Sequence, residues 1–185
     1  GLASAYFLLQ RTDKTVILLE ADKIAHGATG HNAGQLVTYF ERDFSDLVED
    51  FGLELAAAGQ AAVESGWQLL EEMIAEASLS LPLHRFTGYD GYSTIEQLLL
   101  RLEEERLRRE GGLRVEEILV AEDPLVLLRI PDEYASLYRT VSREDIRDLL
   151  ETDDNSYIAV KAAPKGCMNS ALFCEQIAEW LEQKF

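Results

Sequence analysis

The stretch that most constrains the fold runs from Thr15 to Leu36, TVILLEADKIAHGATGHNAGQL. Val16 to Leu19 form a short, unbroken apolar run that ends at Glu20, a pattern typical of a strand buried on both faces in a parallel sheet. An acid that closes such a strand can accept hydrogen bonds from a ribose. Three glycines, Gly27, Gly30 and Gly34, follow among small residues, and they let backbone N–H groups approach a ligand closely.

The preceding residues, Gly1 to Gln10 (GLASAYFLLQ), have the apolar spacing of a helix that starts on a glycine. In a dinucleotide-binding βαβ unit, the last glycine of G-x-G-x-x-G opens the helix and an acid follows about 20 residues later. Gly1 and Glu20 fit that spacing. The first strand and the first two glycines of the motif lie outside these 185 residues.

Together, GLASAYFLL and VILLEADKIAHGATGHNAGQL resemble the FAD-dependent oxidoreductases of the D-amino-acid oxidase and glycine oxidase type. The stretches Arg85–Leu119 and Gly166–Phe185 are similar to later parts of that family. The resemblance implies a partial FAD-binding domain at 1–40, a substrate-side portion at 41–165, and a helix returning to the FAD-binding domain at 166–185.

The resemblance also implies an activity, which is the oxidation of an amine or amino acid by hydride transfer to FAD. The family's catalytic residues would come after this chain ends, so none is assigned here. Because the chain resembles a family member shortened at both ends, we expect it alone to be inactive and to hold FAD weakly. Unpaired apolar faces would then favour self-association.

The expected FAD-binding residues combine the spacing argument with the resemblance. They are Gly1, Glu20, Ala28, Thr29, Gly30, His31, Asn32, Ala33, Gly34 and Gln35. His31 falls on the histidine to which dimethylglycine and sarcosine dehydrogenases attach flavin covalently. Gly30 precedes it where that pattern has Trp, so we expect noncovalent FAD. Two plainer readings stay open: Glu20 as an ordinary strand-end acid, and the glycine-rich stretch as a tight turn.

Composition narrows the classes of partner. The chain has 17 basic and 34 acidic residues, a net charge of −17, which argues against nucleic acid or an anionic membrane surface as partner. No apolar run is long enough for a transmembrane helix, and no Cys/His cluster has metal-ligand spacing. Cys167 and Cys174, seven apart in an expected helix, are too distant for a disulfide, which favours the reducing cytoplasm.

Periodicity and capping residues predict a helix-rich α/β fold, α+β in its substrate-side part. Strands are expected at 15–19, 84–92, 113–120 and 157–162, with the middle two largely antiparallel. Helices are expected at 1–10, 44–77 with a break near Gly52, 94–110, 143–150 and 169–183. Glu and Arg at spacings of three and four in TIEQLLLRLEEERLRREGG predict a solvated helix face.

Two other functions remain open. The chain could be a non-catalytic acidic α/β module that acts in protein association, or part of an NAD(P)-dependent oxidoreductase. The glycine-rich loop after Glu20 argues against the second, because NAD-binding domains do not require it. A visible absorption spectrum separates a flavoprotein from an association module. The sequence identifies neither the amine nor the electron acceptor.

Overall fold

The computed structural model describes residues 1–185 and divides them into two compact units. The first unit contains Gly1–Val37, Trp67–Arg85 and Gly166–Phe185. The second contains Thr38–Gly66 and Phe86–Lys165. Each unit is built from segments far apart in the sequence.

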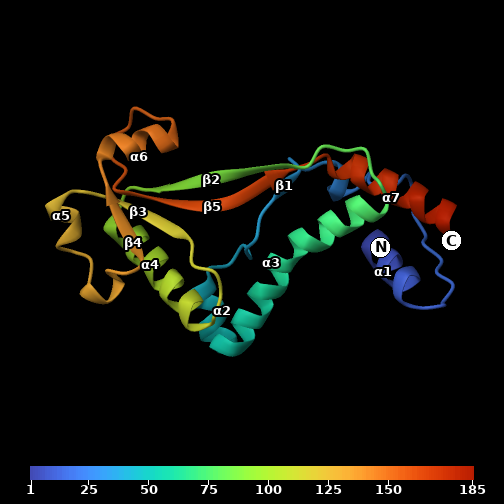
Figure 1. Ribbon diagram of the computed structural model, residues 1–185, viewed down its shortest axis with the longest axis horizontal. Helices are drawn as coiled ribbons and strands as arrows, with labels where there is room; N and C mark the ends of the chain where they lie inside the picture. Colours follow the sequence, from blue (N-terminus) through green and yellow to red (C-terminus); the bar gives the residue numbers. More distant parts are fainter. The chain divides into compact units, whose positions relative to one another are not determined.

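Helices make up the larger part of the regular structure (Figure 1). They are α1 (Leu2–Arg11), α2 (Phe44–Phe51), α3 (Leu53–Glu76), α4 (Ile95–Glu110), α5 (Pro124–Leu127), α6 (Arg143–Leu150) and α7 (Ser170–Lys184), with 3₁₀ turns η1 (Ala28–Gly30) and η2 (Asp132–Tyr134). The strands are β1 (Gln35–Leu36), β2 (His84–Tyr92), β3 (Glu117–Ala121), β4 (Tyr138–Val141) and β5 (Ala159–Cys167). The expected mixed, helix-rich α/β class is confirmed. No helix combines the length and apolar character needed to cross a membrane.

The five strands form one sheet in the order β1-β5-β3-β4, and β2 also pairs with β5. β5 runs antiparallel to β3 through Glu117–Ala162 to Val120–Ala159, and antiparallel to β1 through Gln35–Cys167. β3 and β4 are parallel, with Ile118 opposite Tyr138. The sheet is therefore mixed, and the strands expected at 84–92 and 113–120 both use β5 as their neighbour.

The core of the second unit lies on both faces of β3. Successive strand residues point to opposite faces. Ile118 and Val120 pack with Leu98 and Leu102 of α4, whereas Leu119 and Ala121 pack with Ile146 of α6. Because helices cover both faces of β3, all of its side chains after Glu117 can be apolar.

The first unit has a smaller core at the contact of α1 with α7. Tyr6 of α1 packs with Ile177 and Leu181 of α7 and with Met73 of α3. The Tyr6 hydroxyl donates to the carboxylate of Glu76, which also pairs with Lys184. Burying a tyrosine ring while its hydroxyl keeps a partner avoids the cost of an unsatisfied polar group.

Several helix starts that were predicted from capping residues in the sequence are confirmed. Thr94 and Ser142 each form a capping box, in which the side chain accepts from the amide of the third helical residue and that residue's side chain returns a bond. Asn169 caps α7 through the Leu172 amide. The predicted break at Gly52 is confirmed: its φ of +79° suits glycine and separates α2 from α3.

The strand predicted at Thr15–Leu19 is wrong. Residues 14–20 adopt no regular structure, and Ile17 and Leu19 are 81% and 88% exposed. A strand needs backbone hydrogen bonds from a neighbour, and none of the strands in the sheet pairs with this segment. The apolar run therefore has no strand partner.

Other differences concern boundaries. β3 begins four residues later than expected, and β5 extends through Pro164 to Cys167, so Cys167 ends a strand instead of lying in a helix with Cys174. Both cysteines are free. β4 falls where no strand was expected, because four residues with Arg139 and Thr140 exposed carry little strand signal. The solvated face expected for 94–110 is wrong in part, since Glu104, Glu105 and Arg108 are buried.

Truncating Leu102 tests the packing of α4 on the sheet. Leu102→Ala should lower the free energy of unfolding by about 2–5 kcal/mol, because it leaves a cavity in the core. Leu100→Ala, on the same helix at a side chain 37% exposed, is the matched control and should cost less than about 1 kcal/mol. Urea unfolding followed by circular dichroism measures both. Equal losses would contradict the assignment of the buried face.

Candidate functional site

The glycine-rich loop of the first unit is folded by its own polar groups. The 3₁₀ turn η1 closes with the Gly30 amide donating to the Gly27 carbonyl (3.1 Å) and the His31 amide to the Ala28 carbonyl (3.2 Å). The Asn32 side-chain amide donates to the Thr29 carbonyl (2.8 Å), and Asn32 Oδ1 accepts from the Gly34 amide (2.6 Å). The Asn32 side chain therefore bonds backbone groups both before and after it, and so stabilises the turn that follows η1.

Two of the three glycines are required by close backbone contacts. A Cβ on Gly30 would lie 1.9 Å from the Ala25 carbonyl oxygen, and one on Gly34 would lie 2.0 Å from that of Met168. Gly34 also has a φ of +66°, which side-chain-bearing residues rarely adopt. Gly27, in contrast, has open space around it.

Residues next to the start of α7 hold this loop in place. The Met168 amide donates to the Gly34 carbonyl (3.0 Å), and Gln35 pairs with Cys167 in the ladder of β1 and β5. The Ser170 hydroxyl bonds the Thr29 carbonyl and approaches Asn32 Oδ1 at 3.1 Å. The loop is thus clamped by a segment more than 130 residues away in sequence.

The loop leaves donors free for a ligand. The backbone amides of Asn32 and Ala33 have no partner in the chain, and both residues are exposed. The His31 ring is also exposed, and its Nδ1 lies 2.9 Å from the Gly27 carbonyl oxygen. Because the Gly27 carbonyl oxygen can only accept a hydrogen bond, the neutral His31 ring carries its hydrogen on Nδ1. Free amides on a rigid turn suit an anionic or carbonyl-rich ligand.

Glu20 and Gly1 lie at a different part of the first unit. Glu20 Oε1 accepts from the amides of Ala21 (2.7 Å) and Asp22 (3.1 Å), which leaves Oε2 without a partner. Glu20 lines a cavity of about 790 Å³ with residues of α1, of the segment 12–18 and of the end of α7. Gly1 is the N-cap of α1, beside Leu18. The structure thus gathers residues 28–35 at the start of α7 and Glu20 beside α1.

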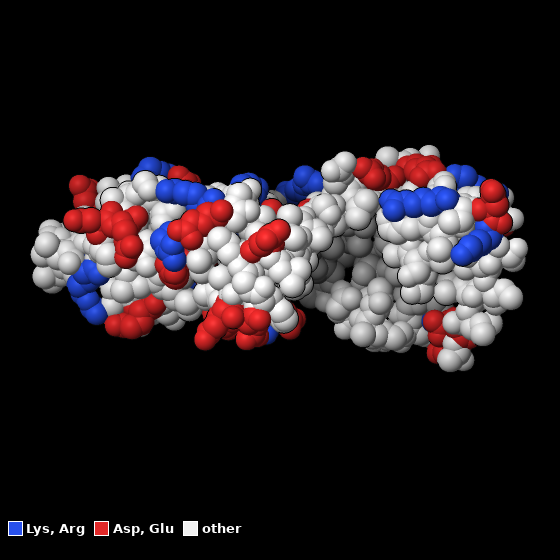
Figure 2. All heavy atoms as spheres, turned by 90° about the horizontal axis from the view of Figure 1, so that it is seen from below, with Lys and Arg blue, Asp and Glu red and all other residues white.

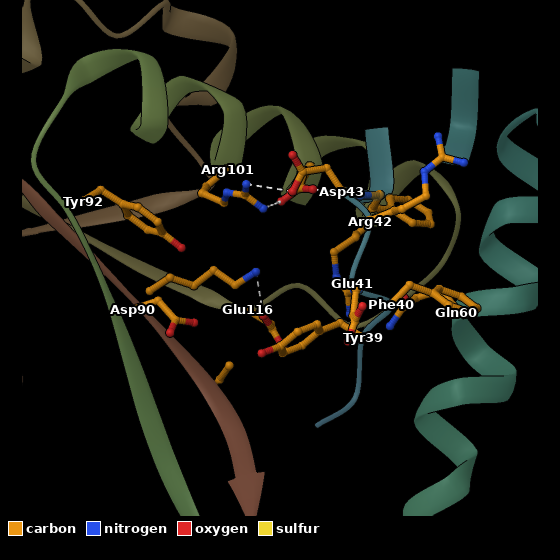
Figure 3. A pocket seen from close by; sticks show the side chains of 15 residues that line it. Tyr39, Phe40, Glu41, Arg42, Asp43, Gln60, Asp90, Tyr92, Arg101 and Glu116 are labelled. Atoms are coloured by element: carbon orange, nitrogen blue, oxygen red, sulfur yellow. Dashed lines mark hydrogen bonds and ion pairs between the residues drawn. The ribbon is translucent and has the colours of Figure 1, made fainter. Parts of the chain in front are cut away.

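Sequence reasoning missed a polar pocket in the second unit. It has a volume of about 310 Å³ and is drawn in Figure 3. Its lining residues come from the segment after β1, from helices α2, α3 and α4, from strands β2 and β5, and from the residue just before β3. They are Tyr39, Phe40, Glu41, Arg42, Asp43, Phe44, Gln60, Asp90, Tyr92, Arg101, Glu104, Arg108, Glu116, Lys161 and Ala163.

Buried ion pairs form the floor of this pocket. Lys161 Nζ lies 2.8 Å from Glu116 Oε2 and 3.1 Å from Glu105 Oε1. Glu105 is fully buried, and its other oxygen accepts from the Glu116 amide (2.7 Å). Glu105 Oε1 is within ion-pair distance of Lys161 but lacks a well-directed hydrogen bond, so its charge is only partly compensated.

This burial shifts several pKa values. Burial raises the pKa of Glu105, against the opposing attraction of Lys161. Burial also opposes the charged form of Lys161, but the carboxylates of Glu116 and Glu105 outweigh it and hold the lysine pKa above its ordinary value. The Tyr92 hydroxyl has its pKa raised to about 12, chiefly by burial, so it is a neutral hydroxyl at pH 7.

One signal in the sequence could have revealed the pocket. Arg101, Glu104, Glu105 and Arg108 recur at spacings of three and four and so share one side of α4. The same spacing describes Glu103, Arg106 and Glu110, which form a partly exposed ion-pair group on that helix. Spacing alone does not distinguish the buried set from the exposed one.

Charged side chains are spread widely over the surface. On the face shown in Figure 2, acidic and basic groups alternate in small clusters, and no extended basic patch is present. Nowhere in the chain do three or more His, Cys, Asp or Glu side chains gather in a way that could hold a metal ion.

Comparison with known proteins gives two findings. The profile of a family described as FAD dependent oxidoreductase matches residues 1–184. Gamma-glutamylputrescine oxidoreductase of Escherichia coli (strain K12) is 34% identical over 74 residues, which is 40% of this chain and 17% of that protein. The stretch compared therefore spans less than a fifth of that relative. No solved structure matches the chain.

Replacing Gly34 tests whether its backbone geometry is required. Gly34→Ala should lower the free energy of unfolding by about 2 kcal/mol or more, because the methyl group meets the Met168 carbonyl and the φ is strained. Gly27→Ala has room for its methyl group and a φ of −83°, so it should change stability by less than about 0.5 kcal/mol. Thermal unfolding of both variants decides the matter; a tolerated Gly34→Ala would contradict the loop geometry.

The buried Glu105 should give a characteristic pH dependence. Its pKa is raised in the folded chain, so between the unfolded and folded values only the folded state holds the proton, and stability falls as pH rises. Glu105→Gln removes this loss, so its stability relative to the unsubstituted chain should increase with pH. Urea unfolding at several pH values measures the difference.

Glu103 is the matched control with the opposite sign. Hydrogen bonding to Arg106 lowers its pKa, so its stabilisation is present above the unfolded pKa and disappears as pH falls through the folded value. Glu103→Gln should therefore be less stable than the unsubstituted chain near pH 7 and equal to it in acid. Parallel pH trends for the two variants would show that Glu105 is not desolvated.

Proposed function

Because the chain belongs to the family of FAD dependent oxidoreductases, we propose that it carries the flavin-binding loop of an enzyme that oxidises an amine or amino acid. The observation that supports this most strongly is the loop from Ala28 to Gln35. Its backbone approaches Ala25 and Met168 so closely that glycine is required at positions 30 and 34, and residues 32 and 33, whose amides have no partner in the chain, are exposed.

Distinct parts of the cofactor would be held by distinct groups. The Asn32 and Ala33 amides and the Thr29 hydroxyl would donate to flavin oxygens, and Gln35 continues that surface. Glu20 Oε2, which has no partner in the chain, would accept from a ribose hydroxyl. Gly1, at the N-terminus of α1, would lie against the pyrophosphate. FAD bound there would accept a hydride from the carbon next to the amine nitrogen.

The substrate class is proposed from the family and the relative. The relative is named a gamma-glutamylputrescine oxidoreductase, and we propose that this chain's substrate is a small amine or amino acid. We propose residues 1–40 as part of the FAD-binding domain, 41–165 as the substrate side, and 166–185 as the helix that returns to it. The free cysteines suit a reducing cytoplasm.

An absorption spectrum tests the proposal. A full-length enzyme that includes these residues, rather than the 185-residue chain alone, should show the two visible bands of oxidised flavin, and anaerobic addition of a small amine should bleach them. Such an enzyme that is fully folded yet colourless after incubation with excess FAD would overturn the flavin assignment. Bound flavin that no amine bleaches would leave the cofactor assignment intact and overturn the reaction.

His31 is proposed to touch the flavin without a covalent bond. Acid precipitation should release all yellow colour into the supernatant, and His31→Ala should retain flavin with at most about tenfold weaker affinity, the loss of one hydrogen bond. Absorbance of pellet and supernatant measures this. Colour that stays with the precipitate and is lost in His31→Ala would show a covalent link.

A further inference from the structure

The segment of residues 14–20 in the first unit has the composition of a strand but no strand partner. It follows α1 in Figure 1, where it is drawn as a loop. The backbone N–H and C=O groups of residues 15–19 form no hydrogen bond within the chain. Free backbone groups beside apolar side chains are what an edge strand presents, and such an edge pairs readily with another chain. The segment can therefore accept a strand from a second molecule.

Side chains of this segment alternate between a covered face and an exposed face. Val16 packs against the core formed by α1 and α7, and Val16 and Leu18 both line the cavity of about 790 Å³ beside those helices. Ile17 and Leu19 do not line that cavity, and they are 81% and 88% exposed. A period of two is the pattern of a strand with one face on a core. A two-stranded ribbon needs such a core beneath it to be stable in water, and α1 and α7 supply one.

The charges of the segment, KTVILLE, are complementary to themselves when two copies run antiparallel. With Ile17 on the two-fold axis, Lys14 of one copy stands opposite Glu20 of the other, and the same pair forms at the other end. Side chains directly opposite in an antiparallel pair are close enough to interact. Lys14 is exposed, and Glu20 Oε2 has no partner in the chain, so both are open to this pair. A parallel pair would instead place like charges together at both ends.

The same register brings apolar side chains together on both faces of the ribbon. Val16 of one copy stands opposite Leu18 of the other on the covered face, and the two copies of Ile17 meet on the exposed face. A shift of one residue would place covered side chains opposite exposed ones. A shift of two residues would place a charged end of the segment opposite an apolar side chain. Charge and face therefore agree in one register.

We propose that two copies of this chain pair through residues 14–20 as an antiparallel two-stranded ribbon with its two-fold axis at Ile17. The same surface is used by both copies, so the assembly closes at two chains. The net charge of −17 on each chain opposes association, and the complementary ends of the segment offset this repulsion at the contact. The inference goes beyond the proposed flavin binding, because it concerns the chain without flavin.

Sedimentation equilibrium of the full chain without flavin, over a range of concentrations at fixed ionic strength, tests the proposal. We expect a reversible equilibrium between monomer and dimer. Ile17→Lys should weaken the dimer by about tenfold or more, because the axis sets the two new ammonium groups opposite each other. Leu128→Lys is the matched control: it adds the same charge at a leucine that is 84% exposed at the end of α5, so the dimer should be unchanged.

Exchanging the charged ends of the segment tests the register. Lys14→Glu sets two carboxylates opposite each other at both ends of the ribbon and should weaken the dimer about tenfold. The double variant Lys14→Glu/Glu20→Lys restores opposite charges and should recover the dimer. Lys23→Glu changes the net charge as Lys14→Glu does, at an exposed lysine outside the segment, and should leave the dimer intact. In a parallel pair the single and double variants would dimerise alike.

Four results would each overturn the proposal. They are a chain that stays monomeric at its highest soluble concentration, a mass that keeps rising beyond two chains, loss of the dimer in Leu128→Lys but not in Ile17→Lys, and a double variant that dimerises no better than Lys14→Glu. All the substituted side chains are exposed, and circular dichroism checks that each variant is folded. Flavin is absent throughout, so these results are independent of whether the chain binds it.

Discussion

The backbone hydrogen bonds of β5 are the interaction on which most of the structure depends. β1, β2 and β3 all pair with this one strand, and β3 in turn carries β4. Near its start, β5 places Lys161 against Glu105 and Glu116. At its end, Cys167 pairs with Gln35, and Met168, the next residue, bonds Gly34. One strand therefore supports both the glycine-rich loop and the polar pocket.

Local signals predicted the helices well and the sheet less well. Thr94, Ser142 and Asn169 mark helix starts because their side chains bond amides three residues away, an interaction contained within a short stretch. A strand depends instead on a distant neighbour. Thr15–Leu19 has strong strand character but no partner in the sheet, whereas Tyr138–Val141 has weak strand character and pairs with β3.

The two candidate sites differ in how far sequence could reveal them. The loop residues 28–35 were predicted from the family resemblance together with their glycine-rich pattern, and Gly30 and Gly34 prove to be sterically required; their contact with FAD stays a prediction. Ser170 and Met168, which hold the loop, carry no such local signal. The pocket was missed because identical spacings of Glu and Arg describe the buried and exposed sides of α4, and only tertiary packing separates them.

We propose that the loop clamped by the residues around Met168 and Ser170 contacts the flavin. Hydrogen exchange of the backbone amides, measured by mass spectrometry with and without FAD, tests it most directly. We expect slower exchange in a peptide covering residues 28–35 when FAD is present, and unchanged exchange in α4 (95–110). Bound FAD that leaves the exchange of residues 28–35 unchanged while protecting another segment would contradict it.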